Sequence, residues 1–192
     1  IKFYELLLKK HGKNFNSLNW GSKESQFKRF EILASIGIKS NDKVLDVGCG
    51  LADFYNWLQI NIPFVDYHGI DLTAEMVRQT KERFPELSIE NKIIFEIASE
   101  IPLYDFVVAS GIFYLRRENP QEYMLKTIEK MFELAKKGIA FNSLSTWSAK
   151  HDKNEFYADP LELLSLIRSN LTTQVILRHD YHPNDFSIFI YK

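Results

Sequence analysis

The 192-residue sequence is poor in cysteine, in net charge and in long apolar runs, and each shortage excludes a class of protein. Cys49 is its only cysteine, so an internal disulfide is excluded, which fits a reducing compartment. No apolar run is long enough to cross a membrane, and no secretory signal is visible. We therefore expect a cytoplasmic protein with no membrane contact.

The formal net charge is −1, from 24 Lys and Arg against 25 Asp and Glu. No overall field attracts nucleic acid and no basic stripe is visible, so a nucleic-acid partner is disfavoured. The five histidines are scattered without ligand spacing, which predicts no metal site. A hydrophobic fraction of 45% is ordinary for a globular domain, and nothing in the pattern specifies an oligomeric state.

What the sequence does contain is one glycine-rich corner, VLDVGCGLADF, over residues 44–54. The apolar run at its start predicts a buried strand. Gly48 and Gly50 permit a tight turn and the close approach of a ligand to the backbone. Asp53 is then a suitable first-turn acid for an amphipathic helix. Strand, glycine turn and helix together predict a nucleotide-type binding corner.

Acidic residues distinguish between the ligands that such a corner binds. The sixth position counted from Gly48, a glycine in the dinucleotide fingerprint, is Asp53. Asp53 and Asp46 would repel a pyrophosphate but suit a ligand with positive charge and no phosphate. The stretch resembles motif I of the class I S-adenosylmethionine-dependent methyltransferases, in which an acid precedes a GxGxG turn. Ala52 stands here in place of the last glycine.

A second acid follows at the spacing that nucleotide-binding folds use. Asp71 lies 19 residues past Ala52, at the end of a strand predicted over residues 64–70. An acid about 20 residues beyond the glycine turn accepts the ribose hydroxyls. Asp71 resembles the acidic motif II residue of the same family; the alternative is that it caps the helix that follows Thr73.

The resemblance implies a Rossmann-like α/β fold with a seven-stranded, mostly parallel sheet, an antiparallel last strand and the strand order 3-2-1-4-5-7-6. We predict strands over residues 44–47, 64–70, 93–97, 105–109, 138–143, 173–179 and 186–191. Gly138 is predicted to stop the helix that starts near residue 122. Only residues 98–104 would separate the third and fourth strands, so the short helix that the family often has there must be nearly absent. We expect one domain, residues 1–192, with a helical cover (1–37) and a Rossmann-like core (38–192).

The resemblance also implies a cofactor site for S-adenosylmethionine, with S-adenosylhomocysteine as the product. Related methyltransferases place an N-terminal helical segment over the methionine end of the cofactor. Cys49 is interpreted as a small turn residue because no histidine lies near it in the sequence to activate its thiol. The predicted cofactor-binding residues are Asp46, Gly48, Cys49, Gly50, Asp71, Leu72, Met76, Ser99, Ser110 and Gly111, with Trp20, Gln26 and Arg29 from the N-terminal segment.

The acceptor is expected to be a small molecule, as in trans-aconitate-type methyltransferases, which the chain resembles in general shape. His179 and Tyr114 are the candidate catalytic residues, since a general base is needed when the acceptor must lose a proton. A carboxylate acceptor needs no base and would favour an arginine, Arg178 or Arg116. Arg116 and Arg117 are otherwise interpreted as solvated surface charge. Two alternatives stay open: methylation of RNA or protein, although the NPPY motif is missing, and a non-catalytic or NAD-binding module.

Overall fold

The structure is a computed structural model that describes residues 22–98 and 102–192. It contains one seven-stranded sheet in the order β3-β2-β1-β4-β5-β7-β6, in which only β7 runs antiparallel to its neighbours. The predicted fold class is thereby confirmed. The strands are β1 (Lys43–Val47), β2 (Asp66–Asp71), β3 (Ser88–Asn91), β4 (Tyr104–Ala109), β5 (Ala135–Leu144), β6 (Val175–Arg178) and β7 (Asp185–Tyr191).

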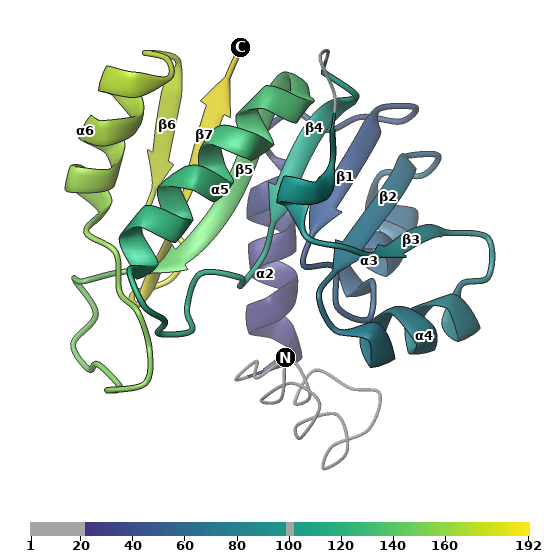
Figure 1. Cartoon of the computed structure of the whole chain (residues 1–192), viewed down its shortest axis with the longest axis horizontal. Helices are drawn as coiled ribbons and strands as arrows, with labels where there is room; N and C mark the ends of the chain where they lie inside the picture. Colours follow the sequence, from purple (N-terminus) through teal and green to yellow (C-terminus); the bar gives the residue numbers. More distant parts are fainter. Residues whose placement is uncertain (1–21, 99–101) are drawn as a thin grey trace.

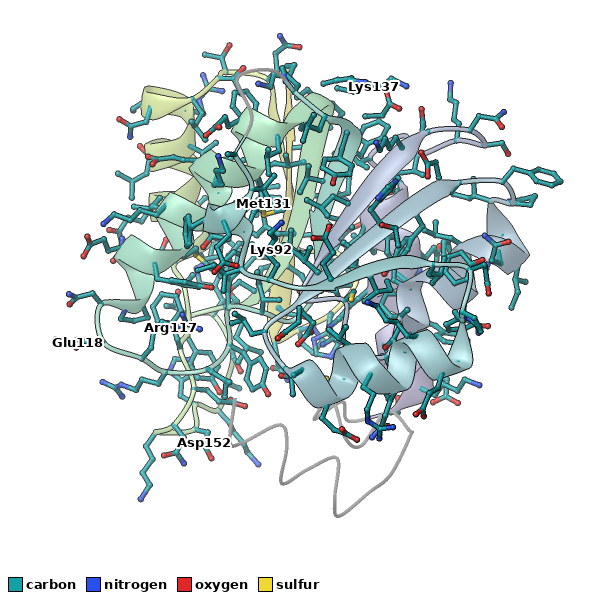
Figure 2. All side chains as sticks on the ribbon, turned by 45° about the vertical axis from the view of Figure 1, so that its right-hand side comes forward. Lys92, Arg117, Glu118, Met131, Lys137 and Asp152 are labelled. Atoms are coloured by element: carbon teal, nitrogen blue, oxygen red, sulfur yellow. The ribbon has the colours of Figure 1, made fainter. Side chains whose placement is uncertain are left out.

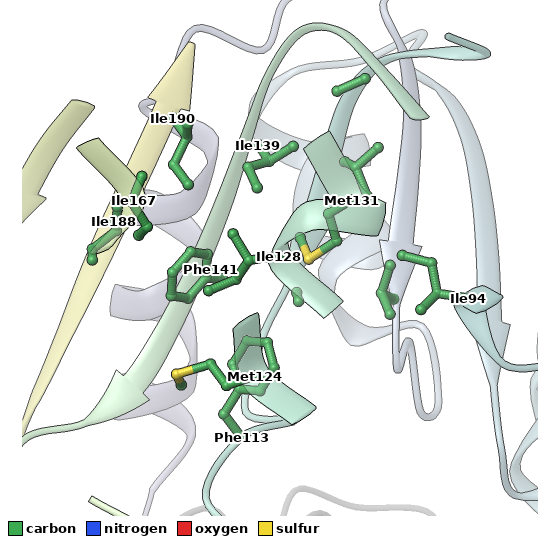
Figure 3. Packing of buried hydrophobic residues seen from close by; sticks show 14 of the residues in the cluster. Ile94, Phe113, Met124, Ile128, Met131, Ile139, Phe141, Ile167, Ile188 and Ile190 are labelled. Atoms are coloured by element: carbon green, nitrogen blue, oxygen red, sulfur yellow. The ribbon is translucent and has the colours of Figure 1, made fainter. Parts of the chain in front are cut away.

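Helices cover both faces of this sheet (Figure 1). They are α2 (Lys23–Ala34), α3 (Asp53–Asn61), α4 (Ala74–Arg83), α5 (Pro120–Leu134) and α6 (Pro160–Asn170), with a 3-10 turn, η2 (Ile94–Glu96). Side chains alternate across β1, so Val44 packs in the cluster with α2 and α3, whereas Leu45 packs in the cluster with α5 and α6. Figure 3 shows the second cluster, in which Ile128 and Met131 of α5 pack beside Phe141 of β5.

The third strand lies earlier in the chain than the sequence predicts. We expected it over residues 93–97, but β3 spans Ser88–Asn91 and residues Ile94–Glu96 form η2 instead. As an edge strand, β3 buries only Ile89, so it needs no apolar run. Ile94 is buried in the opposite direction, against the α5 face. The crossover to β4 therefore runs from residue 92 to residue 103 and is longer than the predicted 98–104, although the only helix among its described residues is the short η2.

Gly138 does not end a helix, contrary to the prediction. Helix α5 ends at Leu134 and β5 begins at the next residue, so Gly138 lies within β5. A Cβ atom at this position would lie 2.7 Å from the carbonyl oxygen of Ile190 in β7. The glycine is therefore explained by the close approach of two strands.

Candidate functional site

A cavity of about 160 Å³ opens at the carboxyl ends of β1, β2 and β4, where ligands bind in open α/β sheets. The segments that follow these strands supply most of its wall, and α2 and the first turn of α5 complete it. Its lining residues are Gln26, Phe30, Asp46, Val47, Gly48, Cys49, Gly50, Asp53, Phe54, Ile70, Asp71, Leu72, Thr73, Met76, Lys92, Ile93, Ile94, Ser110, Gly111, Ile112, Leu115, Arg117 and Tyr123.

The glycine turn forms the floor of this cavity. Gly48 (φ +75°) and Gly50 (φ +54°) have left-handed backbones, which glycine adopts without steric cost. A Cβ atom on Gly48 would lie 2.4 Å from Cγ2 of Ile112, so the segment after β4 packs directly on the turn. The backbone N–H of Gly48 donates to the carbonyl of Ile70 at 2.8 Å, which fixes the turn beside the end of β2.

Asp71 ends β2 with its carboxylate facing the glycine turn. Its Oδ2 accepts the N–H of Gly50 at 2.9 Å, and its Oδ1 accepts the N–H of Thr73 at 2.8 Å. Each carboxylate oxygen keeps a second lone pair for a ligand hydroxyl. Burial raises the pKa of Asp71, and these two hydrogen bonds oppose that shift. Thr73 occupies the N-cap position of α4 without a side-chain capping bond, so Asp71 serves both the turn and the helix start.

Asp46 is buried behind the same turn. Its Oδ2 accepts the hydroxyl of Tyr67 at 2.5 Å. Burial, assisted by the nearby Asp71 charge, raises the pKa of Asp46 to about 7, although the Tyr67 hydrogen bond opposes the rise. Asp53 also lines the cavity, but Arg83 pairs with it at 2.7 Å. The turn therefore presents carboxylates rather than the amide-and-cation set that binds phosphate.

Cys49 fills the inside of the turn. The side chain is buried, and its Sγ lies 2.8 Å from where a Cβ on Gly69 would be. Burial raises the pKa of the Cys49 thiol, and the charges of Asp46 and Asp71 raise it further. The thiol is therefore protonated and tightly packed, as expected for a small turn residue.

The carboxyl end of β4 meets β5 through a side chain on β5. Gly111 (φ +70°) donates its N–H to Oδ1 of the buried Asn142 at 2.7 Å, and Nδ2 of Asn142 lies 3.4 Å from Oγ of Ser110. This contact fixes Ser110 and Gly111 at the cavity wall. Leu72 and Met76 line the adjoining wall, Leu72 with 43% exposure and Met76 buried.

The residues predicted from the N-terminal segment have different positions. Gln26 is buried at the cavity wall, with Nε2 3.4 Å from Oδ2 of Asp53. Arg29 is directed instead at Asp185 of β7, with Nε 2.5 Å from Oδ2, and both side chains are buried. Its role toward a cofactor carboxylate stays a prediction. Trp20 and Ser99 lie outside the described residues.

The two candidate catalytic residues are not among the lining residues of this cavity. His179 follows β6, and its ring stacks on Trp147 at 4.8 Å and on Phe186 at 6.3 Å. Val175 and Leu177 pack against the α5 and α6 cluster, so the face that His179 shares with them points inward. Tyr114 accepts the N–H of Phe156 at its carbonyl oxygen, 2.7 Å away. Their catalytic roles stay predictions.

Several lining residues escaped the sequence analysis, namely Lys92, Ile93, Ile94, Leu115, Arg117 and Tyr123. Arg116 and Arg117 were both interpreted as solvated surface charge, although adjacent side chains diverge. Alternation along the extended segment after β4 would have separated the two arginines, since Leu115 and Arg117 share a side and Arg116 has the other.

The polar groups that line the cavity fit S-adenosylmethionine. Carboxylates surround the glycine turn, and a buried carboxylate at the end of β2 can accept hydroxyl protons. A phosphate would favour a lysine or arginine at this turn, and none of the described lining residues at the turn is one. Lys92 and Arg117 belong to segments beyond β3 and β4. None of the helices in the described part of the chain combines the length and apolarity needed to cross a bilayer.

Comparison with known proteins agrees with this reading of the cavity. A family model described as "Methyltransferase domain" matches residues 38–182. The "Putative methyltransferase Rv1506c" of Mycobacterium tuberculosis is 32% identical over 154 residues, which are 77% of this chain and 91% of that protein. A trans-aconitate 2-methyltransferase of Rhodopseudomonas palustris is 38% identical over 56 residues, which are 29% of this chain and 22% of that protein.

The fold also matches solved structures. The plantazolicin methyltransferase BpumL, crystallised with a triazolic desmethylPZN analog and S-adenosylhomocysteine, aligns with a TM-score of 0.65. The alignment covers 100% of this chain and 96% of that chain at 16% identity, so it establishes a likeness of fold.

Proposed function

The chain belongs to the class I S-adenosylmethionine-dependent methyltransferases, and from this membership we propose that it methylates a small-molecule acceptor. The observation that carries the proposal is a continuous cavity in the described part of the chain, which extends from the glycine turn to Tyr123 in the first turn of α5. A ligand at the turn and a second small ligand would share one cavity. The name of one relative, a trans-aconitate 2-methyltransferase, specifies a small-molecule acceptor.

Different residues of the cavity are proposed to contact different parts of the cofactor. We propose that Asp71 accepts hydrogen bonds from the ribose hydroxyls and that the Gly48–Gly50 backbone lets the ligand approach the turn. In its ionised form Asp46 favours the positively charged part of the ligand, and a bound cation would in turn lower its pKa. The remaining proposed contacts come from the apolar or small side chains and polar groups around this floor: Gln26, Cys49, Leu72, Met76, Ser110 and Gly111.

When bound, S-adenosylmethionine supplies a methyl group on a positively charged sulfur, which is displaced in line by the acceptor. The chain therefore mainly orients two ligands and excludes water. A base is required only for an acceptor that must lose a proton before attack. His179 is the proposed base, with Tyr114 as the alternative; the inward direction of the Val175 face supports His179.

The proposal is tested by measuring S-adenosylhomocysteine formation in the presence of three acceptor sets: small amines, alcohols and carboxylic acids; total RNA; and unfolded protein. We expect turnover with a member of the small-molecule set and none with the polymers. Turnover with RNA or protein alone would overturn the small-molecule proposal. A preference for NAD over S-adenosylhomocysteine in calorimetry would contradict the cofactor itself.

A further inference from the structure

The segment after β4 is extended and paired with the connection after β5. Leu115 forms an antiparallel bridge with Glu155, and the N–H of Arg116 donates to the carbonyl of Asn154 at 3.1 Å. Successive side chains of such a segment point to opposite sides. Leu115 and Arg117 therefore share one side, and both line the cavity.

The neighbouring arginine points the other way. Nη1 of Arg116 donates to the carbonyl of Lys153 at 3.2 Å, outside the cavity lining. Arg178 is engaged by both carboxylate oxygens of Asp180, at 2.7 and 2.8 Å. Neither arginine that the sequence favoured for an acidic acceptor is therefore part of the cavity wall. Arg117 is.

Arg117 is held in place by an aromatic ring. Its guanidinium carbon lies 3.6 Å from the ring centroid of Tyr123, and Phe95 packs edge-on against the same ring. A guanidinium stacked in this way keeps its forked N–H groups available in its own plane. Within residues 22–98 and 102–192, no carboxylate lies within ion-pair distance of Arg117.

Charge is therefore separated within the cavity. Asp46 and Asp71 lie at the glycine turn. Arg117 and Lys92, both labelled in Figure 2, come from the segments beyond β4 and β3. Lys92 pairs with Glu90 at 3.2 Å, whereas Arg117, an exposed residue at the edge of the cavity, has no carboxylate partner among the described residues. A cationic methyl donor and an anionic second ligand match this arrangement.

We propose that Arg117 is the specificity-determining residue for the acceptor and that it binds a carboxylate or phosphate group of that molecule. This inference rests on the proposed small-molecule acceptor and names its chemical class. Planar arginine donors bind both anions in bidentate geometry, so the two groups share one recognition chemistry. The competing occupant is the carboxylate of the cofactor itself.

The test measures anion binding to the protein saturated with S-adenosylhomocysteine, with citrate and inorganic phosphate as probes, by calorimetry or chemical-shift titration. We expect Arg117→Gln to weaken the better-bound probe about tenfold or more, because a charged hydrogen-bond donor is lost. Arg116→Gln, the adjacent matched control, should change it less than about twofold. S-adenosylhomocysteine affinity should be equal in both variants.

Three results would overturn the inference. They are equal probe affinity in Arg117→Gln and wild type, the absence of probe binding to the loaded protein, and a parallel loss of S-adenosylhomocysteine affinity in Arg117→Gln. The last assigns Arg117 to the cofactor carboxylate. Preference for citrate or for phosphate identifies which anion the acceptor carries. Because cofactor affinity is measured separately in wild type, failure of the proposed function is distinguished from failure of this assignment.

Discussion

Oδ2 of Asp71 accepts the N–H of Gly50 at 2.9 Å, so the acid at the end of β2 is bonded directly to the turn that follows β1. Binding and local stability are thereby coupled at one carboxylate. A change at Asp71 removes a ligand contact and also leaves a buried backbone N–H without its acceptor.

Asp71→Ala is expected to weaken S-adenosylhomocysteine binding by about 1–3 kcal/mol, because the proposed ribose contact loses a charged acceptor. Calorimetry measures the affinity, and urea denaturation measures how much of the loss reflects a weaker turn. Asp71→Asn keeps one acceptor oxygen, so its affinity for S-adenosylhomocysteine should lie between those of wild type and Asp71→Ala. Unchanged affinity in Asp71→Ala would rule out the ribose contact.

Gly48→Ala is expected to lower the free energy of unfolding by more than backbone strain alone explains. Its left-handed φ costs an alanine about 1–2 kcal/mol, and the new Cβ would lie 2.4 Å from Cγ2 of Ile112. In the double variant Gly48→Ala/Ile112→Ala the steric clash is absent. The stability losses of the two single variants should therefore sum to more than the loss measured for the double variant. Additive losses in urea denaturation would mean that Ile112 moves aside freely.

The sequence specified those parts of the site that depend on neighbours in the chain. Gly48, Gly50 and Asp71 follow from local turn chemistry and from spacing, and each lines the cavity. The position of β3 did not follow, because an edge strand that buries only Ile89 lacks the apolar pattern of a central strand. The apolar residues after it were misassigned for the same reason.

The place of Arg117 in the cavity wall was missed because the segment is extended only through its pairing with a distant part of the chain, and alternation of side chains applies only once that pairing is known. Its side of the chain is set by the bridge between Leu115 and Glu155, and its ring partner Tyr123 lies in the next helix. Likewise, no residue near Arg29 in the sequence predicts its ion pair with Asp185, which lies 156 positions away. Pairings of that separation are set by the packed fold and not by local pattern.

Arg29→Gln is expected to lower the free energy of unfolding by about 3–5 kcal/mol, because it leaves Asp185 buried with only the imidazole of His182, 2.6 Å from its Oδ1, as a partner among the described residues. The surface pair Lys28–Glu31 on the same helix supplies the control, since Lys28→Gln should cost less than about 1 kcal/mol. Replacing Arg29 and Asp185 together by leucine should recover much of the loss. Equal stability of Arg29→Gln and Lys28→Gln would show that the buried pair contributes little.

The proposed cover, residues 1–37, is expected to gain protection from hydrogen exchange when S-adenosylhomocysteine binds. Gln26 of α2 lines the cavity, so ligand contact there would be transmitted to this segment. Hydrogen exchange followed by mass spectrometry measures this protection. Helix α6 supplies no residue to the cavity lining and serves as the internal reference. Equal protection with and without ligand would make the segment a packed helix region instead of a cover.

Asp46 is expected to make the protein less stable as pH rises from about 4 to about 7. Its pKa is 3.8 in the unfolded reference and about 7 in the folded protein. Between those values the folded state retains a proton that the unfolded state has released, so raising the pH favours unfolding. The slope contributed by this one carboxyl reaches about 1.4 kcal/mol per pH unit.

Asp46→Asn isolates this contribution, because the amide keeps the shape of the side chain but does not titrate. The lowered pKa of His182 acts with the opposite sign in the same window, since the unfolded state then binds the extra proton. Subtracting the stability of Asp46→Asn from that of wild type at each pH removes the contribution of His182. The difference should fall steadily between about pH 4 and 7 and become flat above it. A difference that stays constant across this window would mean that Asp46 is ionised in the folded protein at acidic pH, with Tyr67 as the donor that stabilises its charge.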